Sequence, residues 1–225
     1  KKTNIDWKID TLFLGGGTPS LLSSKQLYKI YKTLDKNLDL SNLSEFTIEA
    51  NPGEFPFNKM ADFKSFGVNR VSFGFQSLDD KILKFLSRWH SSKDCIDSYN
   101  NARKARFENI SIDIIFGIPD QSINQWKRAL NSIINLEPEH ISAYSLTVEE
   151  RTPFYDQVNL GEIIMPHEKI SIDMYSYTMD ILNQGEYLQY ETSHYSKKHR
   201  QCQHNLHYWR REPYLAFGPS AHGYD

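Results

Sequence analysis

Three consecutive glycines at residues 15–17 follow the apolar run Leu-Phe-Leu at 12–14, and Thr18-Pro19 comes next. Because glycine has no Cβ, it reaches positive φ without strain and lets a ligand approach the backbone closely. An apolar run that ends in such a loop is typical of the carboxyl edge of an α/β sheet or barrel, where these folds bind ligands. The spacing fits neither GxGxxG nor a P-loop that ends in GK[ST]. A glycine-rich turn without a ligand is the alternative.

Polar side chains recur where the predicted strands end, at Thr18, Glu49, Gln76 and Asp113. In a parallel barrel the carboxyl ends of the strands converge, so we expect these residues to share one pocket. Two carboxylates, an amide, glycine backbone and Arg88 together suit a zwitterion that bears a ribose. Each carboxylate taken singly has a structural alternative, because Arg70, Arg88 or a backbone amide would also satisfy it.

These positions depend on strands that alternate with helices. The pattern predicts a parallel sheet built from βαβ units, and therefore an α/β fold of the partial (β/α) barrel type. A change of character after Tyr187 places a boundary near residue 191, with a core over 1–191 and a second region over 192–225. The predicted strands are 12–14, 46–50, 68–75, 110–116 and 140–146, and the predicted helices lie near 56–66, 79–87, 92–106, 122–135 and 167–183.

The composition of the 225-residue chain excludes several functional classes. Twenty-six basic residues against 28 acidic ones give a net charge of −2, so we expect no nucleic-acid partner. No apolar stretch approaches the roughly 20 residues that span a bilayer, so we expect no membrane span. Cys95 and Cys202 are the only cysteines and form no CxxC motif, which fits a reducing cytoplasm.

Several motifs, in order, resemble those of radical S-adenosylmethionine enzymes related to oxygen-independent coproporphyrinogen III dehydrogenase. They are GGGTPSLL (15–22), EANPG (49–53), GVNRVSFGFQS (67–77), SIDIIFGIPDQS (111–122) and HISAYSLTVEE (140–150). The later runs QYETSHYSKK (189–198), CQHNLHYW (202–209) and FGPSAHGYD (217–225) are more similar to the heme chaperone W branch. The resemblance implies a partial TIM-like barrel of the radical S-adenosylmethionine type. It also implies a set of S-adenosylmethionine-binding residues: Gly16, Gly17, Thr18, Glu49, Gln76, Arg88 and Asp113.

The run His204-Asn205-Leu206-His207-Tyr208-Trp209 combines imidazoles with aromatic rings. Imidazole is a common axial ligand of heme iron. From the residues alone, a hydrogen-bonded structural histidine is the simpler interpretation of His204. The resemblance makes His204 the expected ligand of heme iron, with Asn205 and Tyr208 in support. Cys202 is an alternative thiolate ligand, and His222 is a weaker candidate.

The family binds a 4Fe–4S cluster through a CxxxCxxC loop, which this sequence lacks. Cys95 and Cys202 cannot replace that loop, so we expect the chain as given to be catalytically incomplete. We expect the loop and the first strand to precede Lys1, and the chain to be truncated at both ends.

The resemblance therefore predicts a heme chaperone that binds S-adenosylmethionine, a 4Fe–4S cluster and heme, and that passes heme to an acceptor protein. Heme or another porphyrin, the acceptor protein and an electron donor are the expected partners. The alternative is an oxygen-independent coproporphyrinogen III oxidase, which decarboxylates propionate side chains oxidatively. A small-molecule binding domain with neither activity is a third reading.

Overall fold

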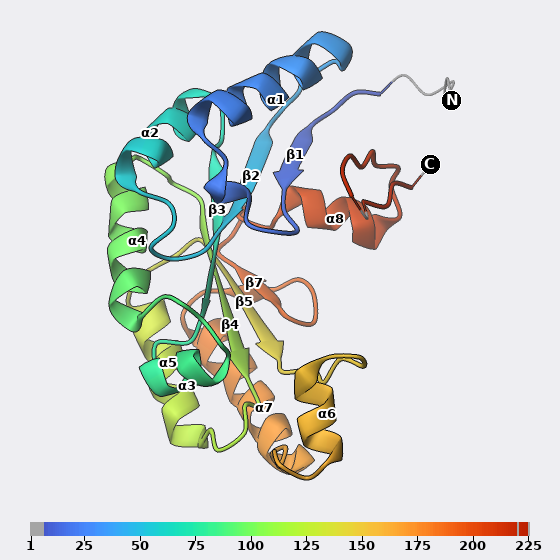
Figure 1. The fold of residues 1–225 in the computed structure, drawn as a ribbon. Helices are drawn as coiled ribbons and strands as arrows, with labels where there is room; N and C mark the ends of the chain where they lie inside the picture. Colours follow the sequence, from blue (N-terminus) through green and yellow to red (C-terminus); the bar gives the residue numbers. More distant parts are fainter. Residues whose placement is uncertain (1–6, 220, 225) are drawn as a thin grey trace.

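The computed structural model describes residues 7–219 and 221–224, which form one curved sheet with helices on its convex side (Figure 1). The described residues contribute seven strands in the order β1-β2-β3-β4-β5-β7-β6. Strands β1 to β5 are mutually parallel, as the alternation of strands and helices predicts. The strands are β1 (Thr11–Leu14), β2 (Glu45–Ala50), β3 (Arg70–Gln76), β4 (Ile110–Phe116), β5 (His140–Ser145), β6 (Leu188–Gln189) and β7 (His194–Ser196).

Three of the helices that cover the convex side begin with a capping box whose N-cap residue is serine. Ser23, Ser91 and Ser122 each accept a hydrogen bond from a backbone N–H three residues later, and the side chain at that later position bonds back. The helices are η1 (Pro19–Leu21, a 3₁₀ turn), α1 (Ser24–Asn37), α2 (Phe57–Ser65), α3 (Asp80–Phe85), α4 (Ser92–Lys104), α5 (Ile123–Ile134), α6 (Pro153–Asn159), α7 (Glu168–Gln184) and α8 (Gln203–Arg210).

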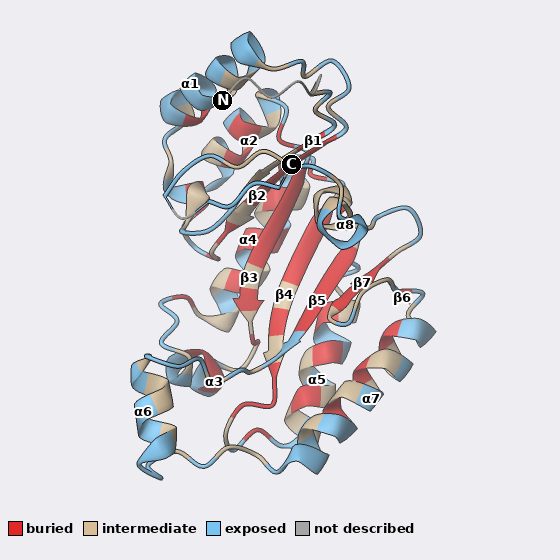
Figure 2. Cartoon of the chain, turned by 90° about the vertical axis from the view of Figure 1, so that its right-hand side faces the viewer, coloured by how far each residue is buried: buried red, intermediate tan, exposed pale blue. Residues whose placement is uncertain are grey.

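The two faces of the sheet differ in polarity because successive strand residues point to opposite sides. In β3, Val71, Phe73 and Phe75 are fully buried and belong to the hydrophobic core beneath the helices. Arg70 and Ser72 occupy the alternate positions and face the concave side, which Figure 2 shows toward the viewer. The concave face is therefore lined with polar groups, and the candidate site residues on the strands lie on this face.

The predicted strands and helices are confirmed to within a few residues, but three features were not expected. Helix α6 (Pro153–Asn159) has no counterpart among the predicted helices. Residues 188–196 form the β6–β7 hairpin, which extends the sheet antiparallel to β5. Helix α8 lies at the opposite edge of the concave face, against β1 (Figure 1). The proposed boundary at 191/192 falls inside the hairpin and remains a prediction.

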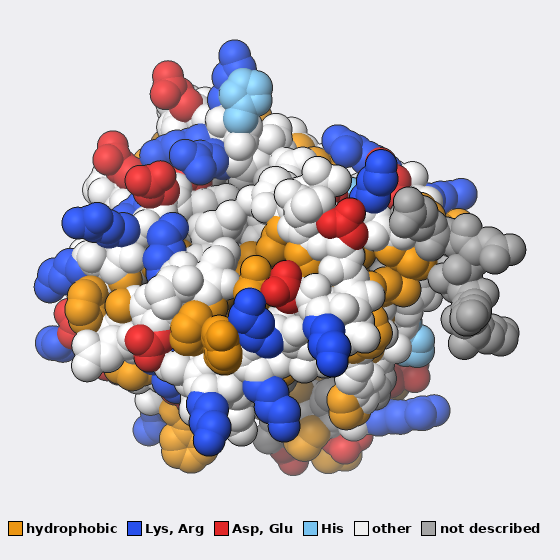
Figure 3. Space-filling view, turned by 90° about the horizontal axis from the view of Figure 1, so that it is seen from above, with side chains coloured by type: hydrophobic (Ala, Val, Ile, Leu, Met, Phe, Trp, Pro, Cys, Tyr) orange, Lys and Arg blue, Asp and Glu red, His pale blue; other side chains and the backbone are white. Residues whose placement is uncertain are grey.

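Lysine and arginine side chains are interspersed with aspartate and glutamate over the face drawn in Figure 3. Within the described ranges, the structure contains no helix with the length and apolar character that a membrane crossing requires.

Candidate functional site

The triple-glycine loop contacts Glu49 at the carboxyl end of β2. The backbone N–H of Gly16 donates a hydrogen bond of 3.0 Å to Oε2 of Glu49. A Cβ at Gly15 would lie 2.7 Å from Cε1 of Phe13 and 3.0 Å from the Glu49 carboxyl carbon. Gly16 has a φ of +98°, which favours glycine, and a Cβ at Gly17 would meet open space. The loop therefore needs glycine for close packing at one position and leaves backbone exposed at the next two.

Asp113 on β4 lies close enough to Glu49 for the two carboxylates to repel each other. Burial raises the pKa of Glu49, and the negative charge of Asp113 also raises it, while the Gly16 amide and the positive charge of Arg70 partly oppose the shift. The hydroxyls of Ser72 and Ser111 donate to Asp113 at 3.1 Å and 3.3 Å. This pair of neighbouring carboxylates has no cation bonded to it among the described residues, so the arrangement favours a positively charged ligand.

Gln76 and Thr18 lie at the same edge of the sheet. Gln76 ends β3 in a left-handed conformation (φ 62°), beside a shift of register with β4. Its Nε2 would be 2.8 Å from a Cβ at Gly74, the register partner of Asp113. The amide of Asn51 donates to the hydroxyl of Thr18 at 3.3 Å.

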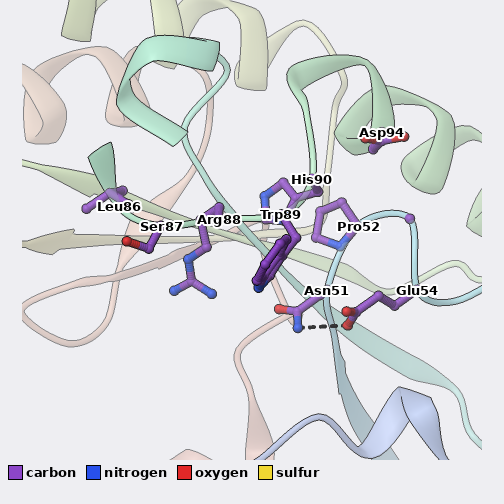
Figure 4. Close-up of a pocket in the computed structure, with 10 residues that line it drawn as sticks. Asn51, Pro52, Glu54, Leu86, Ser87, Arg88, Trp89, His90 and Asp94 are labelled. Carbon is purple, nitrogen blue, oxygen red and sulfur yellow. Dashed lines mark hydrogen bonds between the residues drawn. The ribbon is translucent and has the colours of Figure 1, made fainter. Parts of the chain in front are cut away.

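Arg88 lies on the loop between α3 and α4, where it lines a cavity of about 610 Å³ (Figure 4). Asn51, Trp89 and His90 line it as well, and Nε2 of His90 lies 3.2 Å from the carbonyl oxygen of Phe75. Because Asn51 also contacts Thr18, the cavity adjoins the glycine loop. Glu49, Gln76 and Asp113 lie on the inward face of the strands rather than in the lining of this cavity.

The glycine loop, Glu49, Gln76 and Asp113 thus lie toward the carboxyl ends of the strands, whereas Arg88 lies on the loop between α3 and α4 and lines a cavity that these three side chains do not line. One pocket shared by all of them remains a prediction. The structure does show how the two carboxylates are satisfied. Glu49 bonds to a backbone amide and Asp113 to two serines. Arg70, the other partner suggested by the sequence, is only 2% exposed; it acts on both carboxylates through its charge, and no hydrogen bond joins it to either of them.

The carboxylate of Glu45, at the start of β2, binds the N-terminus of α8. It accepts hydrogen bonds from the backbone N–H of Gln203 at 3.0 Å and of His204 at 3.1 Å. Cys202, the N-cap residue, makes no capping bond with its own side chain, so Glu45 takes that role. The negative charge also suits the positive end of the helix dipole. Helix α8 is thereby fixed on the concave side of the sheet.

His204 is held by contacts from two elements. Its Nδ1 lies 2.9 Å from the hydroxyl of Thr11, and its Nε2 lies 2.8 Å from the hydroxyl of Tyr208. The ring stacks on Phe13 with the centroids 5.2 Å apart. Burial lowers the pKa of His204 to about 4, so the imidazole is neutral near pH 7 and can ligate a metal.

The other candidate ligands near α8 are less suited to a metal. His207 lies between the carboxylates of Asp10 and Glu212. The Cys202 thiol is buried, and burial raises its pKa to about 11. Asn205 follows His204 by one residue, so its side chain is turned by about 100° around the helix axis. His222 is exposed, on a segment that returns toward α8 through the pairing of Tyr214 with Tyr224.

Sequence reasoning missed Thr11, Glu45 and Asn51. The alternation of β1 and β2 marks Thr11 and Glu45 as inward-facing polar residues, which is a usable signal. Neither residue's partner on α8 can be read from that pattern.

Comparison with known proteins identifies the family. The model of the Radical SAM superfamily matches residues 2–133. The chain belongs to this superfamily. It is 40% identical over 217 residues to the heme chaperone HemW of Bacillus subtilis (strain 168), and the match covers 96% of this chain and 57% of that protein. It is 36% identical to the mitochondrial radical S-adenosyl methionine domain-containing protein 1 of Danio rerio, over 96% of this chain and 49% of that protein.

Among solved structures, the fold resembles coproporphyrinogen III oxidase (HemN) from Escherichia coli with a TM-score of 0.80. The sequences are 22% identical over 96% of this chain and 52% of that one, so this likeness concerns the fold. The resemblance seen in the motifs is confirmed, and so is the partial TIM-like barrel of the radical SAM type. The chain spans about half the length of these relatives.

Membership in the family implies S-adenosylmethionine and a 4Fe–4S cluster. The residues present do not fit the cluster, which is held by several cysteine thiolates. Cys95 and Cys202 are buried on separate elements, and burial raises their pKa values to about 12 and about 11. Within residues 7–219 and 221–224, no three His, Cys, Asp or Glu side chains are grouped to hold a metal.

The glycine loop gives the first prediction. Gly15→Ala places a methyl group against Phe13 and Glu49, and we expect it to lower the free energy of unfolding by about 1–3 kcal/mol. Gly17→Ala, whose new methyl group meets open space, is the matched control and should change it by less than about 1 kcal/mol. Urea unfolding measures both. Equal stabilities of the two variants would contradict the packing described here.

The buried histidines give a second prediction. Burial lowers the pKa of His204 to about 4 and that of His140 well below 6.5. In the unfolded chain both titrate near 6.5, so the unfolded state takes up protons first as the pH falls. The free energy of unfolding should therefore decrease between about pH 7 and about pH 5, and it should decrease less in His140→Gln. Urea midpoints that do not depend on pH would contradict this.

Proposed function

We propose that this chain is the part of a heme chaperone that binds S-adenosylmethionine and heme, and that heme passes from it to an acceptor protein. Curated relatives that are 40% and 37% identical over 217 residues are named heme chaperones, which supports this assignment. The cytoplasmic location, the acceptor protein and the electron donor remain predictions from the sequence.

The glycine-loop edge suits S-adenosylmethionine, which carries a sulfonium and an ammonium group, a carboxylate and a ribose. The carboxylates of Glu49 and Asp113 attract the cationic groups and accept hydrogen bonds from an amine or from ribose hydroxyls. Arg88, in the adjoining cavity, suits the ligand carboxylate. Gly16 and Gly17 let the ligand approach the backbone, while Thr18 and Gln76 supply a hydroxyl and an amide.

One observation carries the heme assignment: a neutral, partly exposed imidazole is fixed beside a group of aromatic rings. His204 packs against Phe13 on one side and contacts the ring of Tyr208 on another. Tyr208 continues into Tyr214 with ring centroids 4.6 Å apart, and Tyr214 into Tyr224. Aromatic rings offer the flat apolar surface that a porphyrin requires, and the imidazole offers an axial ligand for its iron. Asn205 would support the site from the same helix.

The alternative is an oxygen-independent coproporphyrinogen III oxidase. The likeness to HemN is one of fold and supports a related family member rather than that activity. An anaerobic assay of the cluster-containing, full-length protein separates the two functions. Formation of protoporphyrinogen would favour the oxidase, and stable heme binding without turnover would favour the chaperone.

Substitutions that remove the charges of Glu49 and Asp113 test whether these residues bind S-adenosylmethionine. We expect Glu49→Gln and Asp113→Asn each to weaken binding about tenfold or more, because a hydrogen bond to a charged group contributes about 1.5–3 kcal/mol. Equilibrium dialysis with the full-length protein measures this. Asp97→Asn is the control, because Asp97 lies on the exposed surface of α4 and pairs with Lys93. Unchanged affinity in both site variants would refute the assignment.

Hemin titration tests the iron ligand. We expect His204→Ala to shift the Soret band and to weaken hemin binding at least tenfold, because it removes the only bond to the iron that this chain is proposed to supply. His199→Asn, in an exposed loop and with a residue that tolerates the left-handed conformation found there, should bind as the wild type does. A Soret spectrum and affinity that are unchanged in His204→Ala would reject His204 as the ligand.

A further inference from the structure

The two nitrogens of His204 lie in different surroundings. Nδ1 faces Thr11, the first residue of β1, whose side chain lies in the buried interior. Nε2 faces Tyr208, one helical turn further along α8 and 40% exposed. Only the Nε2 side of the ring therefore opens toward solvent.

Thr11 and Glu45 together hold His204 in place. Thr11 and Glu45 are register partners on β1 and β2. Glu45 accepts the backbone N–H of His204 at 3.1 Å, while Thr11 bonds to its side chain at 2.9 Å. Backbone and imidazole are thus held from adjacent strand positions, and the stacked ring of Phe13 limits rotation of the imidazole.

The proton on the ring follows from the donors available. A neutral imidazole carries one N–H and offers one lone pair. The phenol of Tyr208 is the stronger hydroxyl donor, because a phenol is more acidic than an aliphatic alcohol. When Tyr208 donates to Nε2, the proton of the imidazole lies on Nδ1 and is donated to Oγ1 of Thr11.

We propose that Thr11 is a positioning residue for iron ligation by His204: it accepts the Nδ1–H, fixes the tautomer and leaves the Nε2 lone pair for heme iron. Tyr208 occupies that lone pair until heme displaces it. The inference rests on the proposed heme-binding function. An acceptor on the second nitrogen is what a metal-bound histidine normally has, since it orients the ring and makes the ligand more basic.

The decisive variant is Thr11→Val, which keeps the shape of the side chain and removes the hydroxyl. Thr47→Val is the matched control, because Thr47 is an inward-facing, buried threonine on the neighbouring strand whose hydroxyl has no partner within the described residues. In titrations of the full-length protein with hemin, we expect Thr11→Val to bind about tenfold more weakly. Thr47→Val should bind as the wild type does, and Thr11→Ser should restore affinity.

Two readouts separate positioning from a structural role. In the ferrous heme complex, resonance Raman spectroscopy should show the iron–histidine stretch at lower frequency in Thr11→Val and at the wild-type frequency in Thr11→Ser. In the heme-free wild type, nitrogen-15 NMR should show His204 protonated at Nδ1. Tyr208→Phe should bind hemin about fivefold more tightly, since iron no longer displaces a hydrogen bond.

The outcomes distinguish this inference from the proposed function. If His204→Ala abolishes ligation but Thr11→Val matches Thr47→Val in affinity and Raman frequency, the inference is overturned and the proposed function stands. If His204→Ala leaves the titration unchanged, the proposed ligand fails, and the inference fails with it. If Thr11→Val does not fold, an Nε2–H tautomer in the wild type still overturns the inference.

Discussion

The bond between Glu45 and the first turn of α8 determines the geometry of the candidate heme site. Glu45 is 5% exposed, and a buried carboxylate is costly unless donors surround it. The donors are two backbone N–H groups of α8 and the thiol of Cys202. Because no side chain of α8 caps its own N-terminus, the helix and its histidine depend on a strand more than 150 residues earlier.

The position of Glu45 on β2 also shows where the candidate heme site lies relative to the candidate S-adenosylmethionine site. Glu45 and Glu49 stand four residues apart on β2, which is about 13 Å along a strand. The residues proposed to bind S-adenosylmethionine therefore lie at the carboxyl end of the strands, and His204 lies nearer the amino end. Phe13 stands between them, since it stacks on His204 and closely approaches the Cβ position of Gly15. The ring of Phe13 thus lies next to both candidate sites.

Local sequence signals predicted the parallel strands of the core. They did not predict helix α8 or the β6–β7 hairpin, whose positions depend on contacts between residues far apart in the sequence. Asn51-Pro52-Gly53 directly follows β2, Gly117 directly follows β4, and a serine capping box begins α5, so residues next to each element define its bounds. Helix α8 has eight residues and the β6–β7 hairpin has shorter strands still, which gives little periodicity to read. The strand-end carboxylates could be predicted from the register of parallel strands. The pairing of Thr11 with His204 could not, because the two residues lie 193 positions apart in the sequence.

Hydrogen exchange at the backbone amides of Gln203 and His204 tests the central claim most directly. The account predicts that both amides are protected in the wild type and exchange rapidly in Glu45→Ala, while the amides of β4 remain protected in both proteins. Equal protection of the two α8 amides with and without the Glu45 carboxylate would contradict it.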